Sequence, residues 1–470
     1  MAACCWKSII STRASERAHR AADCNESIVT DKHSDHPDGS HRANVARCLA
    51  AIESPHGEGA RTFTRVYADA ALAAADAADR AAALGLDPLP LAGLAISIKD
   101  LFDVKGEPTR AGAAIGNDFA PAAADALIVR RLRAAGAAII GKTTMTEFAF
   151  SGLGINPHDG TPANPWRRSE KRIPGGSSSG AAVSVTDGMA DAAIGTDTGG
   201  SVRIPAAMCG LVGFKPTSRQ VPLDGAFPLS QSYDSIGPLA RDVQTCARVT
   251  AVMSGQPFSP VTPRPANGIT IAAVSNYVLD GIEPVIAGAF ERALKQLSAA
   301  GMQIRTVHLD VLDDLPALFV GGGLVAAEAY AIHRALIEKS GPRYDPRVLV
   351  RMLRGKDISS ADYIALLKLR TALIARWTKE CADVDCLAMP TVPVAPPRIA
   401  DLSDDAAYGA TNLLVLRNPT LVNALDGCAI SLPCHAPGEA PAGLMLAAPG
   451  GEDAGLLRIA RTAEDILSRR

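Results

Sequence analysis

Net charge of one sign and long apolar runs are both missing from this sequence of 470 residues. Its 47 lysines and arginines nearly balance its 49 aspartates and glutamates, for a formal net charge of -2. That balance gives no positive field for nucleic acid or an anionic membrane surface, so neither is expected as a direct partner. No uninterrupted apolar stretch reaches the roughly 18 residues that a membrane-spanning helix requires, so no membrane partner is expected.

Metal-binding and disulfide patterns are missing as well. The ten cysteines form no CxxC pair, and the nine histidines form neither HxxxH nor HExxH. A long chain with scattered cysteines is typical of reduced thiols in the cytoplasm. We therefore expect no metal, no cofactor and a cytoplasmic location. Hydrophobic residues make up 47% of the chain, which is enough to build a large core.

The order of patterns along the chain predicts one large α/β domain. Residues 1–42 are polar and aperiodic and are predicted to be a disordered or loosely packed leader, whereas residues 43–470 form the domain. Apolar runs of strand length alternate with helical periodicity, which predicts a mixed or parallel sheet covered by helices. The predicted helices are near 44, 63–84, 124–135, from about 144, 284–300, 411–425 and 453–468; the predicted strands end at Lys99 or cover 137–140, 302–308, 429–433 and 443–447.

Two glycine- and serine-rich segments carry the chemistry, GGSSSGAA at 175–182 and GTDTGGSVRIPA at 195–206. Glycines before Ser201 allow successive backbone amides to converge on one point, as an oxyanion hole requires. The predicted donors are the amides of Thr198, Gly199, Gly200 and Ser201. A serine nucleophile needs a base, and no histidine stands in a suitable context. Lys99, at the end of an apolar strand, becomes a base if burial lowers its pKa towards neutrality.

These motifs resemble the amidase signature family. The resemblance rests on SIKD around Lys99, GGSSSG around Ser177 and GTDTGGSVRIPAAMCGLVGFKPT around Ser201, and on the framing segments KDLFDVKGEPTRAG, LRAAGAAIIGKTTMTEFAF and FPLSQSYDSIGPLAR. It extends from about residue 44 to the C-terminus and weakens after about 250. It implies a single large domain with a mixed central sheet covered by helices on both faces.

The resemblance also implies a mechanism and a site. In it, Ser201 attacks a carboxamide carbonyl, Ser177 on a cis peptide bond relays the proton, and neutral Lys99 accepts it. The C–N bond breaks to give an acyl-enzyme, which water hydrolyses. The substrate is then a small amide. The substrate would be selected by residues 300–440, including Leu318–Tyr330, Pro390–Pro397 and the segment near Asn418.

Three further residues of the motifs have more than one interpretation. Asp197 and Arg203 flank the nucleophile and either pair to brace its loop or contact substrate. Ser178 either joins the hydrogen bonds of the triad or is structural. Ser179 is predicted to begin a helix, and Cys209 to be a packed thiol.

Two short patterns suggest other enzymes and are disfavoured. Residues 176–180 match GxSxG, the nucleophile elbow of α/β-hydrolases, but the preceding RRSEKRIP is no buried strand. Residues 136–143 match the P-loop pattern, but 137–140 are predicted to form a strand rather than a phosphate-binding loop. Lys142 is then a strand-end or surface lysine.

The family resemblance leaves a second function open. The same family contains the glutamine-amidase subunit of a tRNA-dependent amidotransferase complex, which works with partner subunits. The divergent sequence after residue 250 favours a stand-alone amidase. The oligomeric state is open, and a homodimer is the form to test.

Overall fold

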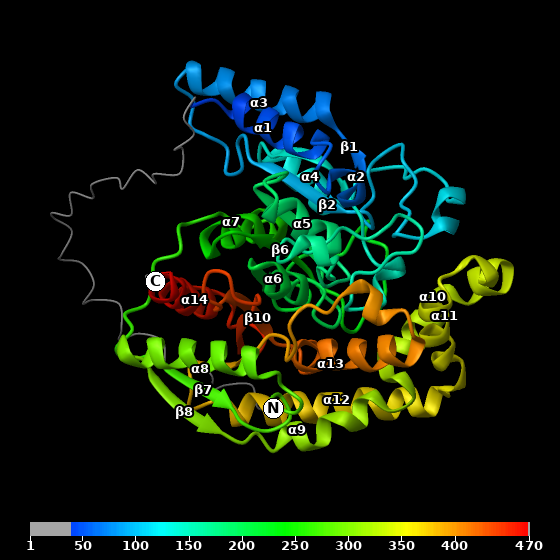
Figure 1. Cartoon of the computed structure of the whole chain (residues 1–470), viewed down its shortest axis with the longest axis vertical. Coiled ribbons are helices and arrows are strands. Elements are labelled where there is room, and N and C mark those ends of the chain that lie inside the picture. The colour runs from blue at the N-terminus through cyan, green and yellow to red at the C-terminus, as the bar shows by residue number, and fades with distance from the viewer. Residues whose placement is uncertain (1–38, 469–470) are drawn as a thin grey trace, which may run out of the picture. The chain divides into compact units, whose positions relative to one another are not determined.

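Eleven strands join into one mixed sheet in the computed structural model, which describes residues 39–468 (Figure 1). The order across the sheet is β1-β3-β2-β4-β6-β5-β10-β11-β9-β7-β8. The strands are β1 Phe63–Val66, β2 Ala95–Lys99, β3 Ala138–Thr143, β4 Ala192–Thr196, β5 Val212–Lys215, β6 Ile236–Ala240, β7 Thr270–Val274, β8 Gln303–Val307, β9 Cys386–Pro390, β10 Cys428–Pro433 and β11 Gly443–Ala448.

The sheet has two parallel groups of strands on either side of an antiparallel centre, and the edge strand β1 pairs antiparallel with β3. Strand β2 runs parallel to β3 and β4, and β7 runs parallel to β8 and β9. The strands β6, β5, β10 and β11 pair antiparallel with their neighbours. Because β2 and β4 are parallel neighbours, their carboxyl ends meet at one edge of the sheet, which brings Lys99 close to Thr196.

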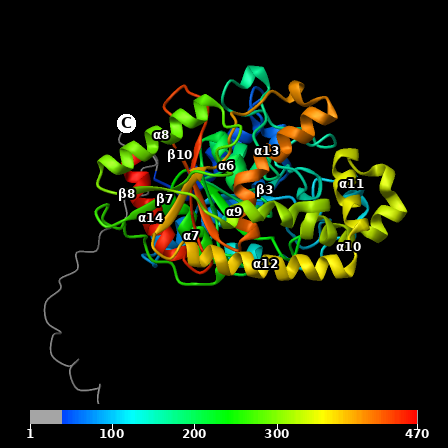
Figure 2. The ribbon, with the colours of Figure 1, turned by 90° about the horizontal axis from the view of Figure 1, so that it is seen from below.

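Helices cover both faces of the sheet (Figure 2). They are α1 His41–Glu53, α2 Gly59–Thr62, α3 Ala68–Ala83, α4 Leu127–Ala134, α5 Ser179–Thr186, α6 Arg203–Cys209, α7 Val243–Ser254, α8 Pro284–Ala299, α9 Val311–Asp314, α10 Gly323–Ser340, α11 Pro346–Leu353, α12 Ser360–Glu380, α13 Asp405–Ala424 and α14 Asp453–Leu467. Their ends follow local chemistry: Asp242 caps the N-terminus of α7 through the Thr245 amide, and Gly255, at φ 78°, ends it.

Alternating strand residues separate the two faces. On β11, Leu444 and Leu446 pack in the core shared with α4, α7, α8 and α14, whereas Met445 between them packs in the core shared with α9, α12 and α13. The same alternation occurs on β4, where Ile194 belongs to the first core and Ala193 packs with α5 and α6. The predicted fold class, a mixed central sheet covered by helices on both faces, is confirmed.

Most predicted elements are present, and two differ. The helix predicted over 63–84 is α3 alone, because residues 63–66 form β1 and pair antiparallel with β3. The structure describes the residues after 144, and they do not form the predicted helix. Only a short 3-10 turn, Glu147–Ala149, lies there, and Phe148 has φ 47°. Pairing with distant strand β3 decides the first difference, and a left-handed residue prevents a helix in the second.

One helical stretch, Val311–Arg343, is long and apolar enough to span a membrane by length and composition alone. It is not one continuous helix, since Val320 and Gly321 have non-helical backbone angles. Leu312, Leu315 and Leu324 are buried in the core beside α12. We therefore interpret the stretch as part of the folded domain.

Of the predicted leader, residues 1–42, the first 38 lie outside the described residues. The described part begins just before α1, whose first residue is His41, so the helix starts two residues inside the predicted leader. The carboxyl of Asp79 on α3 accepts hydrogen bonds from the amides of His41 and Arg42, which fixes α1 against α3.

Candidate active site

Lys99 is the last residue of β2 and is fully buried. Its Nζ donates to Ser177 Oγ at 2.7 Å and to Thr196 Oγ1 at 2.9 Å. Burial lowers the pKa of Lys99 to about 7, and the negative charges of Asp197 and Asp234 oppose the change. A general base at neutral pH needs a pKa lowered in this direction.

Ser177 is fixed in front of Lys99 by an unusual backbone. The Gly176–Ser177 peptide bond is cis, and the Ser177 carbonyl accepts a hydrogen bond from the Thr146 amide at 3.1 Å. A Cβ at position 176 would lie 2.4 Å from the Gly154 nitrogen, so only glycine fits before Ser177. Helix α5 begins at Ser179, as predicted.

Ser178 lies beside the same network and is fully buried. Its Oγ donates to the Thr196 carbonyl at 3.4 Å, while the Thr196 hydroxyl accepts the hydrogen bond from Lys99. Ser178 is therefore connected to Lys99 only through Thr196, which it helps to hold in place. Thr196 itself was missed by the sequence motifs, although it ends the strand next to β2.

Ser201 lies at the floor of a cavity, in the loop between β4 and α6. It is 4% exposed, and Thr198 and Gly199 line the cavity beside it. In the described network, no hydrogen bond joins the Ser201 hydroxyl to Ser177 or Lys99. The structure thus brings Lys99 and Ser177 together, and the contact between Ser177 and Ser201 stays a prediction.

The predicted oxyanion donors divide into two groups. The Gly200 amide donates to Asp197 Oδ1 at 2.8 Å, which disfavours it as an oxyanion donor, and its role there stays a prediction. Its hydrogen is already used to hold the loop. No described residue accepts a hydrogen bond from the amides of Thr198, Gly199 or Ser201, and these three stay predicted donors.

Asp197 and Arg203 brace the loop that carries Ser201. Both are fully buried, and Arg203 Nε and Nη2 donate to the two oxygens of Asp197 at 3.0 and 2.8 Å. Burial opposes ionisation, but Arg203 and a hydrogen bond from Asn423 hold the pKa of Asp197 well below its usual range. Asn423, on α13, also accepts a hydrogen bond from Arg203. Because both charges face each other, we assign them to bracing rather than to substrate contact.

Asp234 is a second buried carboxylate that the sequence motifs did not identify. Thr198 Oγ1 donates to its Oδ1, and the amides of Leu229 and Ser230 donate to its Oδ2 at 2.9 and 3.0 Å. Burial raises the pKa of Asp234 to about 6. It positions Thr198, next to the nucleophile loop.

The cavity above Ser201 has a volume of about 480 Å³. From the segments predicted to select substrate, Phe319, Gly322, Val325 and Ala326 line it, within Leu318–Tyr330. No lining residue comes from Pro390–Pro397. The segment near Asn418 is part of α13, where Leu416, Arg417 and Thr420 face the cavity.

The structure also disfavours the P-loop and nucleophile-elbow interpretations of the two short sequence patterns. Residues 138–143 form β3, and Lys142 on it is 2% exposed, 3.5 Å from Asp100; it is a strand-end lysine and not a surface one. Before the GxSxG match, the structure has a 3-10 turn, Arg168–Glu170, and no buried strand in the described segment 167–174.

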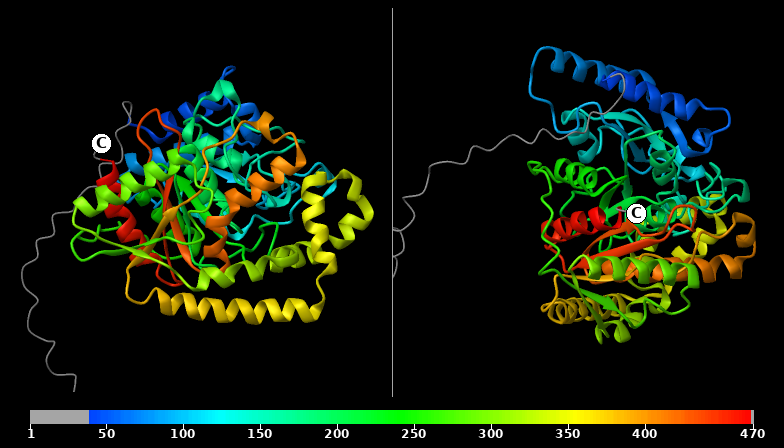
Figure 3. Two further views of the ribbon diagram at one scale, coloured as in Figure 1. Left: turned by 60° about the horizontal axis from the view of Figure 1, so that its bottom comes forward. Right: turned by 60° about the vertical axis from the view of Figure 1, so that its left-hand side comes forward.

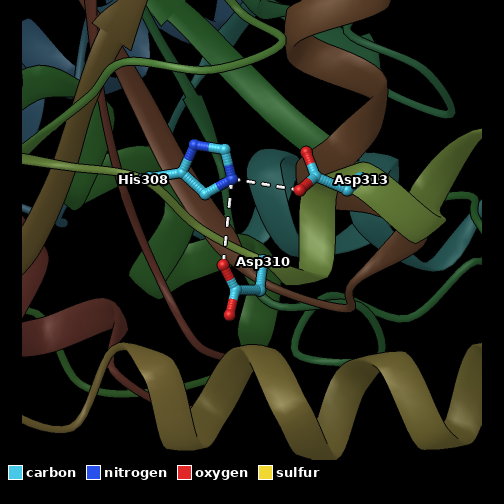
Figure 4. Close-up of side chains that lie close together, drawn as sticks. All are labelled: His308, Asp310 and Asp313. Atoms are coloured by element: carbon cyan, nitrogen blue, oxygen red, sulfur yellow. Dashed lines mark hydrogen bonds and ion pairs between the residues drawn. The ribbon is translucent and has the colours of Figure 1, made fainter.

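One group of possible metal ligands lies on the surface, after β8. His308 Nε2 is 3.0 Å from Asp313 Oδ2 and 3.8 Å from Asp310 Oδ1 (Figure 4). All three side chains are exposed, and none lines the cavity. The contacts are those of surface ion pairs, so we assign no metal to this cluster.

Comparison with protein families identifies the family to which this chain belongs. The Amidase family model matches residues 43–457. The chain belongs to the Amidase family. The match covers the strand with Lys99, both serine-rich segments and the helices around the cavity. The protein is therefore a hydrolase that acts on C–N bonds.

Known amidase relatives match most of the chain. It is 38% identical to 2-amino-5-chloromuconic acid deaminase of Comamonas testosteroni, over 91% of each chain. It is 31% identical to a glutamyl-tRNA(Gln) amidotransferase subunit of a Synechococcus species, over 87% of this chain and 91% of that protein. A solved structure described as an amidase superposes with a TM-score of 0.81 at 31% identity, over 92% of this chain and 97% of that one.

A structure of the peptide amidase PAM superposes with a TM-score of 0.76 at 25% identity, over 91% of this chain and 94% of that one. Relatives with different substrates therefore share the fold of this amidase. The fold positions the reacting groups, and the lining of the cavity has to select the substrate.

Proposed function

We propose that this amidase hydrolyses the C–N bond of a small carboxamide through an acyl-enzyme on Ser201, with Ser177 as proton relay and neutral Lys99 as base. The observation that carries the proposal is the buried Lys99 amine, which is bonded to Ser177 and has a pKa lowered to about 7. A neutral amine in contact with a serine hydroxyl can accept a proton from it.

The first half of the reaction forms the acyl-enzyme. Ser201 Oγ attacks the carbonyl carbon while its proton passes to Ser177 and the Ser177 proton passes to Lys99. The amides of Thr198, Gly199 and Ser201 stabilise the oxyanion. The C–N bond then breaks, and the leaving nitrogen takes the proton back from Lys99 through Ser177.

The second half restores the enzyme. Water attacks the ester carbonyl and gives its proton to Lys99 by the same relay. The ester C–O bond breaks, Ser201 recovers its proton, and a carboxylic acid leaves as its carboxylate. The net reaction consumes one water and yields a carboxylate and ammonia or an amine.

A stand-alone amidase is favoured over a component of an amidotransferase complex. The deaminase of Comamonas testosteroni is 38% identical, whereas the glutamyl-tRNA(Gln) amidotransferase relatives are 31 to 33% identical. A deaminase releases ammonia, which agrees with cleavage of a primary amide or a related C–N bond. We also propose the cytoplasm as its compartment, because the seven cysteines of the described residues are free and buried. A homodimer stays a prediction.

The test is a screen of carboxamides with ammonia release as readout, run on the wild type and on Ser201→Ala. We expect Ser201→Ala to lower the rate by about 10⁴-fold or more, since the chemistry has no other nucleophile. Its melting temperature should stay within about 2 °C of the wild type, because the hydroxyl makes no hydrogen bond in the described network.

Ser254→Ala is the matched control, because Ser254 lies on α7 and donates only to Ala251. It should keep full activity. A Ser201→Ala variant that retains activity would remove Ser201 as the nucleophile. Activity on glutamine that appears only when partner proteins are added would favour a role in an amidotransferase complex instead.

A further inference from the structure

The cavity above Ser201 carries positive charge and no negative charge. Arg351, Arg354 and Arg417 line it, and its described lining contains neither aspartate nor glutamate. Between them lie apolar side chains, including Leu229, Phe319 and Val325. Such a lining fits a short carbon chain that ends in an anion.

The three arginines differ in what they already bind. Arg417 donates to Asn418 Oδ1 at 3.0 Å and to the carbonyls of Asp280 and Val278, so its guanidinium holds a neighbouring loop against α13. Arg354 is exposed, one residue after the end of α11. Neither is placed as a buried anchor for a ligand.

Among these three arginines, Arg351 has N–H groups that donate no hydrogen bond. It lies in the last turn of α11, where its Nε and Nη2 are buried and have no hydrogen-bond partner. Its guanidinium packs near the rings of Phe150 and Tyr408, at 5.7 and 5.6 Å. These contacts orient the planar group but satisfy none of its N–H donors. Arg351 as a whole is half-buried, but leaving two buried N–H donors of a cation without a hydrogen-bond partner is costly, which points to a ligand that supplies an anion.

The two unused donors of Arg351 are the pair that an arginine uses to bind a carboxylate. Elsewhere in this chain, Arg203 uses the same pair of atoms, Nε and Nη2, to bind both oxygens of Asp197. Two parallel N–H···O bonds of this kind are the preferred contact of arginine with a carboxylate. We propose that this amidase acts on acid amides, in which a carbon chain links the scissile amide at Ser201 to a carboxylate bound by Arg351.

The same lining disfavours a substrate with an ammonium group. The carboxylate Asp234 lines a small adjoining pocket, and both its oxygens already accept hydrogen bonds from Thr198, Leu229 and Ser230. An ammonium group in the main cavity would face arginines and no free acid. Glutamine should therefore be a poorer substrate than glutaramic acid, which lacks only the α-ammonium group.

This substrate class rests on the proposed function, and the experiment separates the two. Values of kcat/KM are measured for malonamic, succinamic, glutaramic and adipamic acids and for the neutral amides of equal chain length, propionamide to hexanamide. We expect at least one acid amide to exceed its neutral counterpart by about 10- to 100-fold, as hydrogen bonds to a charged group allow. Glutaramic acid should exceed glutamine.

Variants assign the preference to one residue. Arg351→Gln should bring the ratio of acid to neutral amide to about 1, mainly through KM, and Arg351→Lys should keep part of it. Arg334→Gln is the matched control, since Arg334 lies on α10 with its side chain 69% exposed. It should leave the ratio unchanged. Circular dichroism and melting curves check that each variant is folded.

Two results would overturn the inference while leaving amide hydrolysis intact: a wild type that prefers neutral amides, or an Arg351→Gln variant that keeps the preference. If the wild type hydrolyses none of these amides, calorimetry with glutaramate on Ser201→Ala still decides. If Ser201→Ala binds glutaramate and the double variant that also carries Arg351→Gln does not, the carboxylate site is supported. If Ser201→Ala does not bind glutaramate, the carboxylate site is contradicted.

Discussion

Three buried lysines of this chain show that burial alone does not make a base. Lys142 lies 3.5 Å from the carboxylate of Asp100. Burial lowers the pKa of Lys215 to about 8, but its Nζ donates to the carbonyls of Pro216 and Gly427, which cannot give it a proton. Lys99 instead contacts two hydroxyls, Ser177 and Thr196. Of the three, only Lys99 combines a lowered pKa with a partner that can pass on a proton.

The pKa of Lys99 predicts the pH dependence of the reaction. The base works only when neutral, so kcat/KM should rise with pH through about 7 and level off above it. In Lys99→Ala the residual rate should be far lower and this rise should be gone. The measurement is a pH–rate profile between about pH 5 and 10, where carboxamide substrates do not titrate.

Lys142→Ala is the comparison for that profile, because it removes a neighbouring buried lysine on β3. Its profile should keep the rise near pH 7 even if the variant is less stable. A wild-type profile in Lys99→Ala would mean that another group takes the proton from Ser177.

At the scale of elements, the loop between β4 and α6 holds the nucleophile through one buried ion pair. Asp197 accepts hydrogen bonds from the Gly200 amide and from Arg203, and its backbone carbonyl accepts one from Asn423. A loop rich in glycine would otherwise be free to move. The ion pair therefore fixes the direction in which the remaining amides point.

Removing the cation of this pair should be costly. Arg203→Met leaves Asp197 buried without its partner, and we expect the free energy of unfolding to fall by about 3–5 kcal/mol. The check is denaturant unfolding, with kcat measured on the folded fraction. Arg292→Met, which breaks the surface pair with Glu439, should cost less than about 1 kcal/mol. Equal losses in the two variants would contradict the bracing role.

Two elements differ from the secondary structure predicted from the sequence. Residues 63–66 lie just before the alanine-rich helix α3 and were predicted to belong to it, yet they pair with β3, more than 70 residues away in the chain. The segment after Thr143 has helical periodicity, but Phe148 and Ala149 adopt positive φ angles. Both outcomes depend on contacts with distant residues, which no local pattern contains.

At the scale of the whole described unit, the site is assembled from both halves of the chain. Helices α10 and α11 lie together at one end of the unit (Figure 3), and Arg351 of α11 lines the cavity. Helix α13 packs on the nucleophile loop. Thr420 on α13 donates to the Gly199 carbonyl at 3.1 Å.

Gly200 lies against α13, with no room for a side chain. It has φ 113°, and a Cβ there would lie 2.4 Å from the Pro419 Cβ. Gly200→Ala should therefore lower kcat sharply and reduce the unfolding free energy by more than the roughly 1–3 kcal/mol that backbone strain alone costs. Steady-state kinetics and denaturant unfolding measure the two effects.

Gly268→Ala isolates the backbone contribution. Gly268 has φ 94°, but open space surrounds the position of its Cβ. This variant should lose some stability and keep kcat. If both glycine variants behave alike, contact with α13 does not position the nucleophile loop.

The sequence by itself determined the family, the fold class and the residues predicted to react. Lys99, Ser177 and Ser201 stand in long, specific motifs, and a strand ending in Lys99 follows from a short apolar run. The tertiary structure decided what those motifs cannot encode. It gave Lys99 its second partner Thr196, used the Gly200 amide for bracing, and left two N–H donors of Arg351 without a hydrogen-bond partner. Burial and hydrogen-bond pairing are properties of segments far apart in the chain, and they exist only once those segments pack together.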